Sequence, residues 1–503
     1  MTTTPELPDE TAFEPSDSPP DARAPGRLRA EAPLLDGYLS FRESNPTPFT
    51  TPGHKGRAFT LDKDLAAAVA GDVPLYGGVD TVKSARGLLA TAQERSAKWY
   101  GADWCRYSPG GSTHCNQALC LAIGRPGDKV VVTRSLHRSL LLGMVLADLE
   151  PCWLPTRIDP ATNMPLGVAV DDVESTLAAN PDARAVLVTE PGYLGTLSDL
   201  GSIIEVAHRY GVPVIVDQAW GAHFGYHPDL PPNAMSLGAD AMVTSIHKLL
   251  PGYTQASLVC ARTLRLDPDR LDRGFEAGHT TSAAGQVLAS IDACRVLMEA
   301  RGHELLEGVI ANVHNARQRL REAVPGLGVP DETFFPPGRF DTTRLVLLLS
   351  GVGANGIEIE HKLVEQNIPL ELADRDTIVA IVTVADDEST LDKLVGALVP
   401  AIRQSAGAPR SASVALSWDV KPVYAMSPRA AFFSAHESLP ADQAVGRVSA
   451  ELIAPYPPGI PVLAPGELVT EALLAGLRAV AADGVRVAYA ADPTLSTIEV
   501  VRA

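Results

Sequence analysis

The stretch that decides the fold reads Ala239-Asp240-Ala241-Met242-Val243-Thr244-Ser245-Ile246-His247-Lys248-Leu249-Leu250-Pro251-Gly252. Its first six residues form a short apolar run closed by polar residues, which is typical of a strand buried in a parallel sheet. Further apolar runs at residues 130–133, 185–189 and 212–217 alternate with helical patterns. This alternation predicts an α/β fold with a mostly parallel sheet and helices on both of its faces.

Lys248 comes just past the end of this predicted strand. In open α/β sheets, residues at the carboxyl ends of the strands face the ligand crevice. Partial burial there lowers the pKa of a lysine and makes its amine a nucleophile toward aldehydes. The alternative is a surface lysine at a strand end, since lysine side chains are usually exposed.

Composition and charge narrow the class of protein. The chain has 503 residues, 46% of them hydrophobic and 20% charged, with a formal net charge of −18. This charge argues against a nucleic-acid partner, because phosphates require a basic face. The six cysteines include no CxxC pair, which favours reduced thiols and a reducing compartment. With no basic-then-apolar leader and no apolar run of ~18 residues, we expect a soluble cytoplasmic protein without a membrane segment.

Four features are predicted to meet at the mouth of the sheet. Gly110-Gly111-Ser112-Thr113 opens a helix and suits a phosphate, although Ser or Thr there is often only a cap. His137 begins the helix after the strand at 130–133, and its imidazole is flat enough to stack on a ring. Asp217 ends a strand, and its carboxylate would keep a pyridine nitrogen protonated. Together with the amine of Lys248, these parts predict pyridoxal 5'-phosphate (PLP), whose protonated ring is an electron sink.

Six segments follow from composition and pattern. The acidic, Pro-rich N-terminus predicts disorder, because it cannot bury enough apolar surface, and a small polar stretch near residue 410 predicts a linker. The predicted order is 1–30 disordered tail, 31–60 N-terminal arm, 61–325 PLP-binding large domain, 326–404 small α+β domain, 405–413 linker and 414–503 C-terminal domain.

From about residue 33 to its end the chain resembles the Orn/Lys/Arg decarboxylase family of PLP enzymes, within the aspartate-aminotransferase-like fold (fold type I). The most specific match is the pattern SxHKxLP…TQAS, here residues 245–257. The other matching stretches are TPGHKG at 51–56, GGST at 110–113, DQAWGAHF at 217–224, HPDLP at 227–231 and PYPPGIP at 455–461. The resemblance implies a mostly parallel seven-stranded sheet, a small α+β domain and a C-terminal domain like that of these decarboxylases.

The resemblance also implies roles for residues at matching positions. Lys248 would form the Schiff base, Asp217 would pair with the pyridine nitrogen, and His137 would stack on the ring. Ala219 and Trp220 would line the other ring face, and His247 or Lys248 would return a proton to the product. The phosphate would lie among Gly111, Ser112, Thr113, Ser245 and His247, with Thr281 reaching a neighbouring subunit's phosphate site. A homodimer or higher homo-oligomer with shared active sites follows, and no metal is expected.

The chain departs from the family pattern at four positions. The family often has Glu and His after the strand-end Asp, giving DEAHGAH, where this chain has Gln218 and Trp220. Ala283 stands where the family usually has Pro, and Glu190 stands where a small residue is usual. These four positions bear on the substrate more than on the cofactor.

The implied reaction is decarboxylation of a basic amino acid, with arginine favoured over lysine and ornithine because the compact members with short N-termini resemble arginine decarboxylases. Glu371 and Asp374 lie in a stretch that matches the family and are the candidate partners of the distal cation. A PLP-dependent aminotransferase, lyase or oxidase of a basic amino acid is the alternative, since fold does not fix function. A non-enzymatic regulator is a third reading, which would tolerate loss of Lys248.

Overall fold

The computed structural model describes residues 27–57, 62–73, 86–160, 162, 164–412, 422–456, 459–482 and 485–502. Most of the predicted N-terminal tail, residues 1–26, lies outside them. Across the part that is described, none of the helices combines the length and the apolar character needed to span a bilayer.

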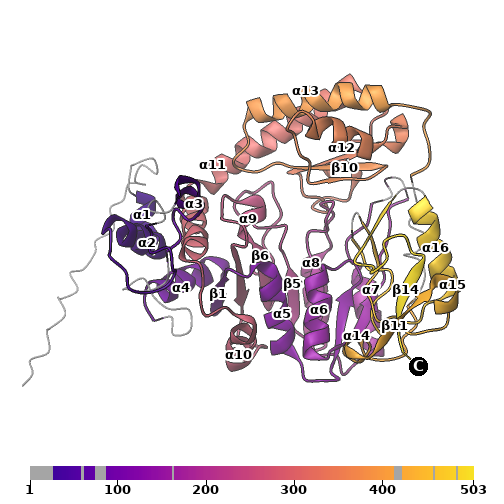
Figure 1. The fold of residues 1–503 in the computed structure, drawn as a ribbon, viewed down its shortest axis with the longest axis horizontal. Helices are drawn as coiled ribbons and strands as arrows, with labels where there is room; N and C mark the ends of the chain where they lie inside the picture. Colours follow the sequence, from indigo (N-terminus) through magenta and orange to yellow (C-terminus); the bar gives the residue numbers. More distant parts are fainter. Residues whose placement is uncertain are drawn as a thin grey trace, which may run out of the picture.

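A seven-stranded sheet forms the centre of the molecule (Figure 1), in the strand order β1-β7-β6-β5-β4-β2-β3. Only β7 runs antiparallel to its neighbours, so the predicted mostly parallel α/β sheet is confirmed. The strands are β1 (Trp104–Ser108), β2 (Lys129–Thr133), β3 (Glu150–Leu154), β4 (Val186–Thr189), β5 (Val214–Asp217), β6 (Ala241–Ser245) and β7 (Ser257–Ala261).

Helices cover both faces of this sheet, because alternate residues of each strand point to opposite sides. In β2, Val131 belongs to one core while Val130 and Val132 belong to the other. The first core contains residues of α4 (Leu88–Tyr100), α7 (Val170–Ala179) and α8 (Leu200–Arg209). The second contains residues of α5 (Gly111–Ile123), α6 (Arg138–Ala147) and α10 (Pro268–Gly278). Both faces are therefore apolar, which explains the continuous Val-rich runs in the sequence.

The long helix α11 (Gly285–Ala323) leads from the large sheet to a smaller unit (Figure 1). This unit holds a three-stranded sheet in the order β8-β10-β9. Its elements are β8 (Arg344–Leu348), α12 (Gly356–Val364), β9 (Leu372–Ala373), β10 (Thr377–Ile381) and α13 (Glu388–Ser405). The described part of the predicted linker, residues 405–412, is hydrogen-bonded to the small unit. Arg410 donates to Asp376 Oδ1 at 2.8 Å and to the carbonyl of Ala354 at 2.7 Å.

The C-terminal unit packs beside the end of the large sheet that carries β3 (Figure 1). Its elements are α14 (Pro428–Phe433), β11 (His436–Pro440), α15 (Ala441–Ala444), β12 (Ala454–Tyr456), α16 (Glu471–Ala482), β13 (Arg486–Ala488) and β14 (Thr497–Val501). Arg134, just past β2, pairs with Glu467 at 2.6 Å, and both side chains are buried. This ion pair joins the C-terminal unit to the loop between β2 and α6.

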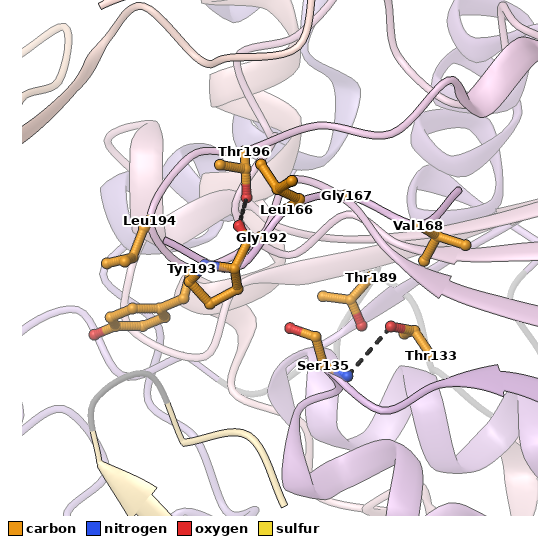
Figure 2. Close-up of a pocket in the computed structure, with 11 residues that line it drawn as sticks. Thr133, Ser135, Leu166, Gly167, Val168, Thr189, Gly192, Tyr193, Leu194 and Thr196 are labelled. Carbon is orange, nitrogen blue, oxygen red and sulfur yellow. Dashed lines mark hydrogen bonds between the residues drawn. The ribbon is translucent and has the colours of Figure 1, made fainter. Parts of the chain in front are cut away.

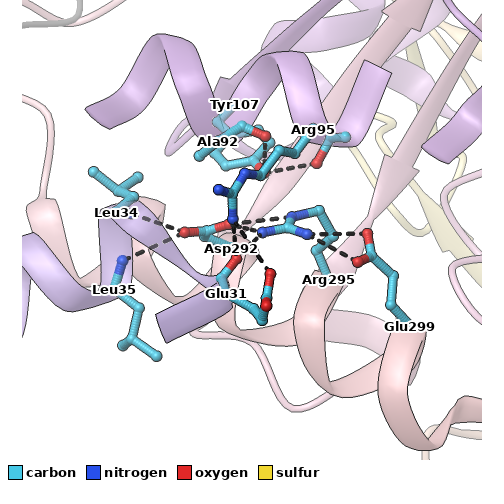
Figure 3. A network of polar contacts seen from close by, with 10 residues as sticks. Glu31, Leu34, Leu35, Ala92, Arg95, Tyr107, Asp292, Arg295 and Glu299 are labelled. Atoms are coloured by element: carbon cyan, nitrogen blue, oxygen red, sulfur yellow. Dashed lines mark hydrogen bonds and ion pairs between the residues drawn. The ribbon is translucent and has the colours of Figure 1, made fainter. Parts of the chain in front are cut away.

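The N-terminal helices are α1 (Arg27–Glu31), α2 (Pro33–Glu43) and α3 (Lys63–Ala68). The tail predicted to reach residue 30 is therefore wrong at its end, because Arg29 hydrogen-bonds Ser40 and Glu43 and orders α1 against α2. A second contact holds α2 against α11. Figure 3 shows that the buried Asp292 of α11 accepts a hydrogen bond from the backbone N–H of Leu34 at 2.9 Å. The first turn of α2 thus obtains a carboxylate partner for its free N–H groups.

Candidate active site

Lys248 lies in α9 (Ile246–Leu249), a single turn that follows β6 directly. Burial lowers the pKa of its amine to about 8, against the opposing effect of the negative charges of Asp217 and Glu371. The ammonium lies 3.9 Å from the centre of the Trp220 ring. Among the described residues it has no hydrogen-bond or ion-pair partner, so this is an activated amine without a structural role in an ion pair.

Asp217 is the last residue of β5 and is 2% exposed. Its Oδ1 accepts from the backbone N–H of Ala219 at 3.1 Å, and its Oδ2 accepts from Asn116 Nδ2 at 2.8 Å. Both oxygens of the carboxylate act as acceptors, and each retains a lone pair for a further donor. A protonated pyridine nitrogen is a donor of the kind that this carboxylate would hold.

The N-terminus of α5 lies against the end of β6. Ser112 Oγ and Ser245 Oγ are 2.7 Å apart, and both side chains are buried. Gly111 has a φ of 68°, and a Cβ there would meet nothing within 4 Å, which leaves open space in front of the helix. The N–H groups of a first helical turn have no partner within the helix. The Gly111 N–H donates to the carbonyl of Gln255 at 3.1 Å, so the N–H groups of Ser112 and Thr113, with the two hydroxyl groups, form the set of donors suited to a phosphate.

The two histidines at the site are held in defined orientations. His247 donates from Nδ1 to the carbonyl of Ala256 at 3.0 Å, and burial lowers the pKa of its imidazole. It is therefore neutral near pH 7 and offers a lone pair on Nε2. His137 is the N-cap of α6, its ring is exposed in the single chain, and it interacts electrostatically with Asp217 and Lys248.

Trp220 lies between Lys248 and Arg344 of the small unit. The Arg344 guanidinium is 4.9 Å from the centre of its ring, and the Tyr193 ring meets it edge-on at 5.3 Å. Tyr193 donates its hydroxyl to Glu371 Oε1 at 2.8 Å, and its oxygen lies 3.4 Å from that of Tyr456 in the C-terminal unit. Three parts of the chain thus contribute to one aromatic and acidic cluster near Lys248.

A pocket opens beside this cluster, at the carboxyl ends of β2 and β4 (Figure 2). Thr133 and Thr189 line it from the two strand ends, and Tyr193 lines it from the loop after β4. Thr189 is paired with Asp217 in the register of β4 and β5. The pocket therefore lies next to the strand that carries the carboxylate.

Of the two candidate cation partners, the structure brings only Glu371 to the site. Asp374 accepts from the backbone N–H groups of Asp376 and Thr377, at 2.6 and 2.5 Å, so its carboxylate closes a turn. Burial raises the pKa of Asp374 to about 6.

Two of the departures from the family pattern support the fold instead of facing the site. Gln218 is 1% exposed and accepts from the backbone N–H of Ala234 at 3.2 Å. The Glu190 carboxyl is also buried and accepts from the N–H and the hydroxyl of Ser198. These residues therefore bear less on substrate choice than Trp220, which contacts Lys248 directly.

Thr113 and Thr281 are exposed in the single chain. The loop that carries Thr281 begins beside α5, where the ring centres of His279 and His114 are 5.3 Å apart. The Thr281 side chain makes no hydrogen bond with the described residues. Its predicted contact with the phosphate site of another subunit therefore stays a prediction.

Sequence reasoning missed Asn116, Tyr193 and Tyr456. The spacing of Asn116, four residues after Ser112 on α5, places both on one helix face and was a usable signal. Nothing in the spacing of the two tyrosines indicated the site, because the structure brings together the loop after β4 and the end of β12, 263 residues apart.

Solved structures of similar fold support the architecture. The lysine decarboxylase LdcF of Francisella novicida superposes with a TM-score of 0.79 at 19% identity, over 94% of this chain and 81% of that one. The constitutive lysine decarboxylase of E. coli gives a TM-score of 0.76 at 20% identity, over 94% and 82%. The predicted fold type I architecture is confirmed.

Sequence comparisons identify the family. Arginine decarboxylase of Halalkalibacterium halodurans is 33% identical, over 94% of this chain and 98% of its own length. Arginine decarboxylase of Bacillus subtilis is 32% identical with the same coverage. The model of the Orn/Lys/Arg decarboxylase major domain matches residues 32–332, and that of the C-terminal domain matches residues 412–483. Membership in the family described by these two models implies pyridoxal phosphate as the cofactor. The chain belongs to the Orn/Lys/Arg decarboxylase family.

Proposed function

We propose that this protein is a PLP-dependent decarboxylase of L-arginine, which releases CO₂ and the corresponding amine. The observation that carries the proposal is the buried Lys248 amine, unpaired among the described residues, beside a strand-end carboxylate, Asp217. Family membership and the two arginine decarboxylases at 33% and 32% identity support it.

The residues present fit the cofactor. Lys248 would hold its aldehyde carbon, Asp217 its ring nitrogen, and His137 and Ala219 its two faces. Gly111, Ser112, Thr113, Ser245 and His247 would surround its phosphate, with Trp220 beside the lysine. When bound, pyridoxal phosphate supplies an electron sink for the electron pair left at the substrate α-carbon as CO₂ departs.

The chain's own groups divide the remaining work. The Asp217 carboxylate would lie at the ring nitrogen, where an opposite charge favours the protonated form of that nitrogen. Lys248, with a pKa of about 8, carries a proton near neutral pH and can give it to the α-carbon. His247 is neutral there with its Nδ1–H bound to Ala256, so Lys248 is the better acid of the two.

Glu371 is the proposed partner of the guanidinium group. Its carboxylate lies near Lys248, since its charge acts on the pKa of that amine, and Tyr193 fixes one of its oxygens. A planar guanidinium can form charge-assisted hydrogen bonds with the carboxylate and stack on the neighbouring aromatic rings.

The direct test measures CO₂ release and products with arginine, lysine and ornithine. We expect the amine of arginine as the main product, at a higher kcat/KM than for the other two. Absence of CO₂ release from all three substrates contradicts the proposal. A keto acid or peroxide in place of the amine would assign the chain to the aminotransferases or oxidases.

We also propose that the active protein is a homodimer in the cytoplasm. The exposed positions of Thr113 and Thr281 in the single chain support this, because a second subunit could cover them.

A further inference from the structure

Two polar side chains, Asn116 and Ser139, connect Asp217 and His137, the two residues on either side of the proposed position of the pyridine ring. Asn116 lies on α5 one turn after Ser112, and its Nδ2 donates to Asp217 Oδ2 at 2.8 Å and to Ser139 Oγ at 2.9 Å. Ser139 Oγ in turn lies 2.8 Å from His137 Nδ1. Asn116 and Ser139 are each 1% exposed, so little water competes for these hydrogen bonds.

The chemistry of the groups fixes the direction of every hydrogen bond. An ionised carboxylate only accepts, so Asn116 must present its NH₂ group to Asp217. The backbone N–H of Ser139 donates to His137 Nδ1 at 3.2 Å, so this nitrogen accepts and the ring proton sits on Nε2. The Ser139 hydroxyl accepts from Asn116 and donates its own hydrogen to the same Nδ1.

The observed orientation of the Asn116 side chain leaves its amide oxygen without a hydrogen bond among the described residues. This oxygen, Oδ1, is buried. Turning the amide over would set this oxygen against the carboxylate and leave the NH₂ group unpaired, which is worse. The contact with Asp217 therefore dictates the orientation of the side chain.

We propose that Asn116 and Ser139 are positioning residues that hold the Asp217 carboxylate in place as the acceptor for the pyridine nitrogen and fix His137 as a neutral imidazole protonated on Nε2. A neutral ring can stack on a protonated pyridine without charge repulsion. This inference rests on the proposed function, because it concerns the same cofactor site.

The surroundings of Asp217 predict how removal of the amide acts. The titratable groups that act on it electrostatically, or on which it acts, are His137, Lys248, Cys115 and Cys120. Without the amide donor, the backbone N–H of Ala219 is the one hydrogen-bond donor left to the carboxylate among the described residues. Asp217 Oδ2 is then no longer held in a fixed direction, and its alignment with the pyridine nitrogen is lost.

The test is a titration of apoprotein with pyridoxal phosphate at neutral pH, comparing wild type with Asn116→Leu, Ser139→Ala and the double variant. For Asn116→Leu we expect binding about tenfold to a hundredfold weaker, the effect of losing a hydrogen bond to a charged group. Ser139→Ala should lose less, because the backbone N–H still holds His137. The double variant should bind no more weakly than Asn116→Leu, since the two residues act in one relay.

Controls separate positioning from folding. Ser96→Ala removes another buried hydroxyl, bound to Tyr107 at 2.7 Å away from the site, and should bind the cofactor like wild type. Asn116→Ser provides a smaller polar variant should Asn116→Leu not fold, with a weaker affinity for the cofactor again expected. Wild-type affinity in the Asn116 variants, or losses that simply add in the double variant, overturns the inference alone. Failure of the wild type to bind the cofactor overturns the proposed function with it.

Discussion

At the scale of single residues, the account rests on charged groups whose surroundings decide their protonation. Lys248 and Asp217 are brought together by adjacent parallel strands, β6 and β5, and both were predictable because each follows an apolar run. The roles of Asn116 and Ser139 were not predictable, since sequence spacing does not show which side chains of two separate helices face one another. The sequence could not separate Glu371 from Asp374 either, because the turn that occupies Asp374 is formed by backbone N–H groups.

Glu371→Gln tests whether the Glu371 carboxylate binds the guanidinium group of the substrate. We expect kcat/KM for arginine to fall about tenfold or more, mainly through KM, because a charge-assisted pair with the guanidinium is lost. Cofactor binding should stay unchanged. Asp374→Asn is the matched control, since its carboxylate only closes a turn. Equal effects of both variants on KM would argue against Glu371 as the partner.

Glu190→Gln tests a buried carboxyl group through stability. Burial raises the pKa of Glu190 to about 8, so the folded protein holds this proton more tightly than the unfolded chain. The group's contribution is complete below the unfolded pKa of about 4.3 and is lost as the pH rises toward 8, by up to about 1.4 kcal/mol per pH unit.

The side chain of the Glu190→Gln variant does not titrate, so the variant does not lose stability in this way. In urea unfolding, the free energy of unfolding of the variant minus that of the wild type should therefore increase between about pH 5 and pH 8. Glu150→Gln alters an exposed carboxylate on β3 and should show no such trend. A constant difference between Glu190→Gln and wild type across this range would show that Glu190 is ionised in the fold.

At the scale of elements, the loop between β2 and α6 is held by the C-terminal unit. Arg134 donates to both oxygens of Glu467, at 2.6 and 2.9 Å, and to the carbonyl of Pro461 at 2.7 Å. Three residues later the same loop carries His137. Sequence patterns predicted the strand and the helix, but not this contact, whose partners are 333 residues apart.

Glu467→Ala should lower the free energy of unfolding by about 3–5 kcal/mol, because it leaves the Arg134 charge buried without a partner. Asp442→Ala breaks the exposed pair with Arg478 and should leave the free energy of unfolding almost unchanged. Denaturant unfolding of both variants provides the measurement. A small effect of Glu467→Ala would mean that water reaches the guanidinium.

At the scale of the whole molecule, the candidate active site brings together the large sheet, the small unit and the C-terminal unit, through Lys248, Glu371 and Tyr456. The layered α/β core followed from the sequence, because strands buried on both faces read as continuous apolar runs. The shared sites between subunits, which only the family resemblance implied, stay a prediction, because Thr281 is exposed in the single chain.

Mixed dimers test whether sites are shared between subunits. Lys248→Ala and Thr281→Trp should each be poorly active alone, the second because a bulky ring would block the neighbouring phosphate site. Refolded together in equal amounts, they should recover up to about a quarter of wild-type activity, since half of the dimers are mixed and each has one intact site. No recovery, with dimers confirmed by sedimentation, would show that each subunit is complete on its own.

The central claim is that one amine, Lys248, holds the cofactor. Its most direct test is borohydride reduction of the protein loaded with pyridoxal phosphate, followed by mass analysis of its peptides. The account predicts the cofactor's mass on the peptide that contains Lys248 and on no other, with no label in Lys248→Ala. A label on a different lysine, or none in the wild type, would contradict it.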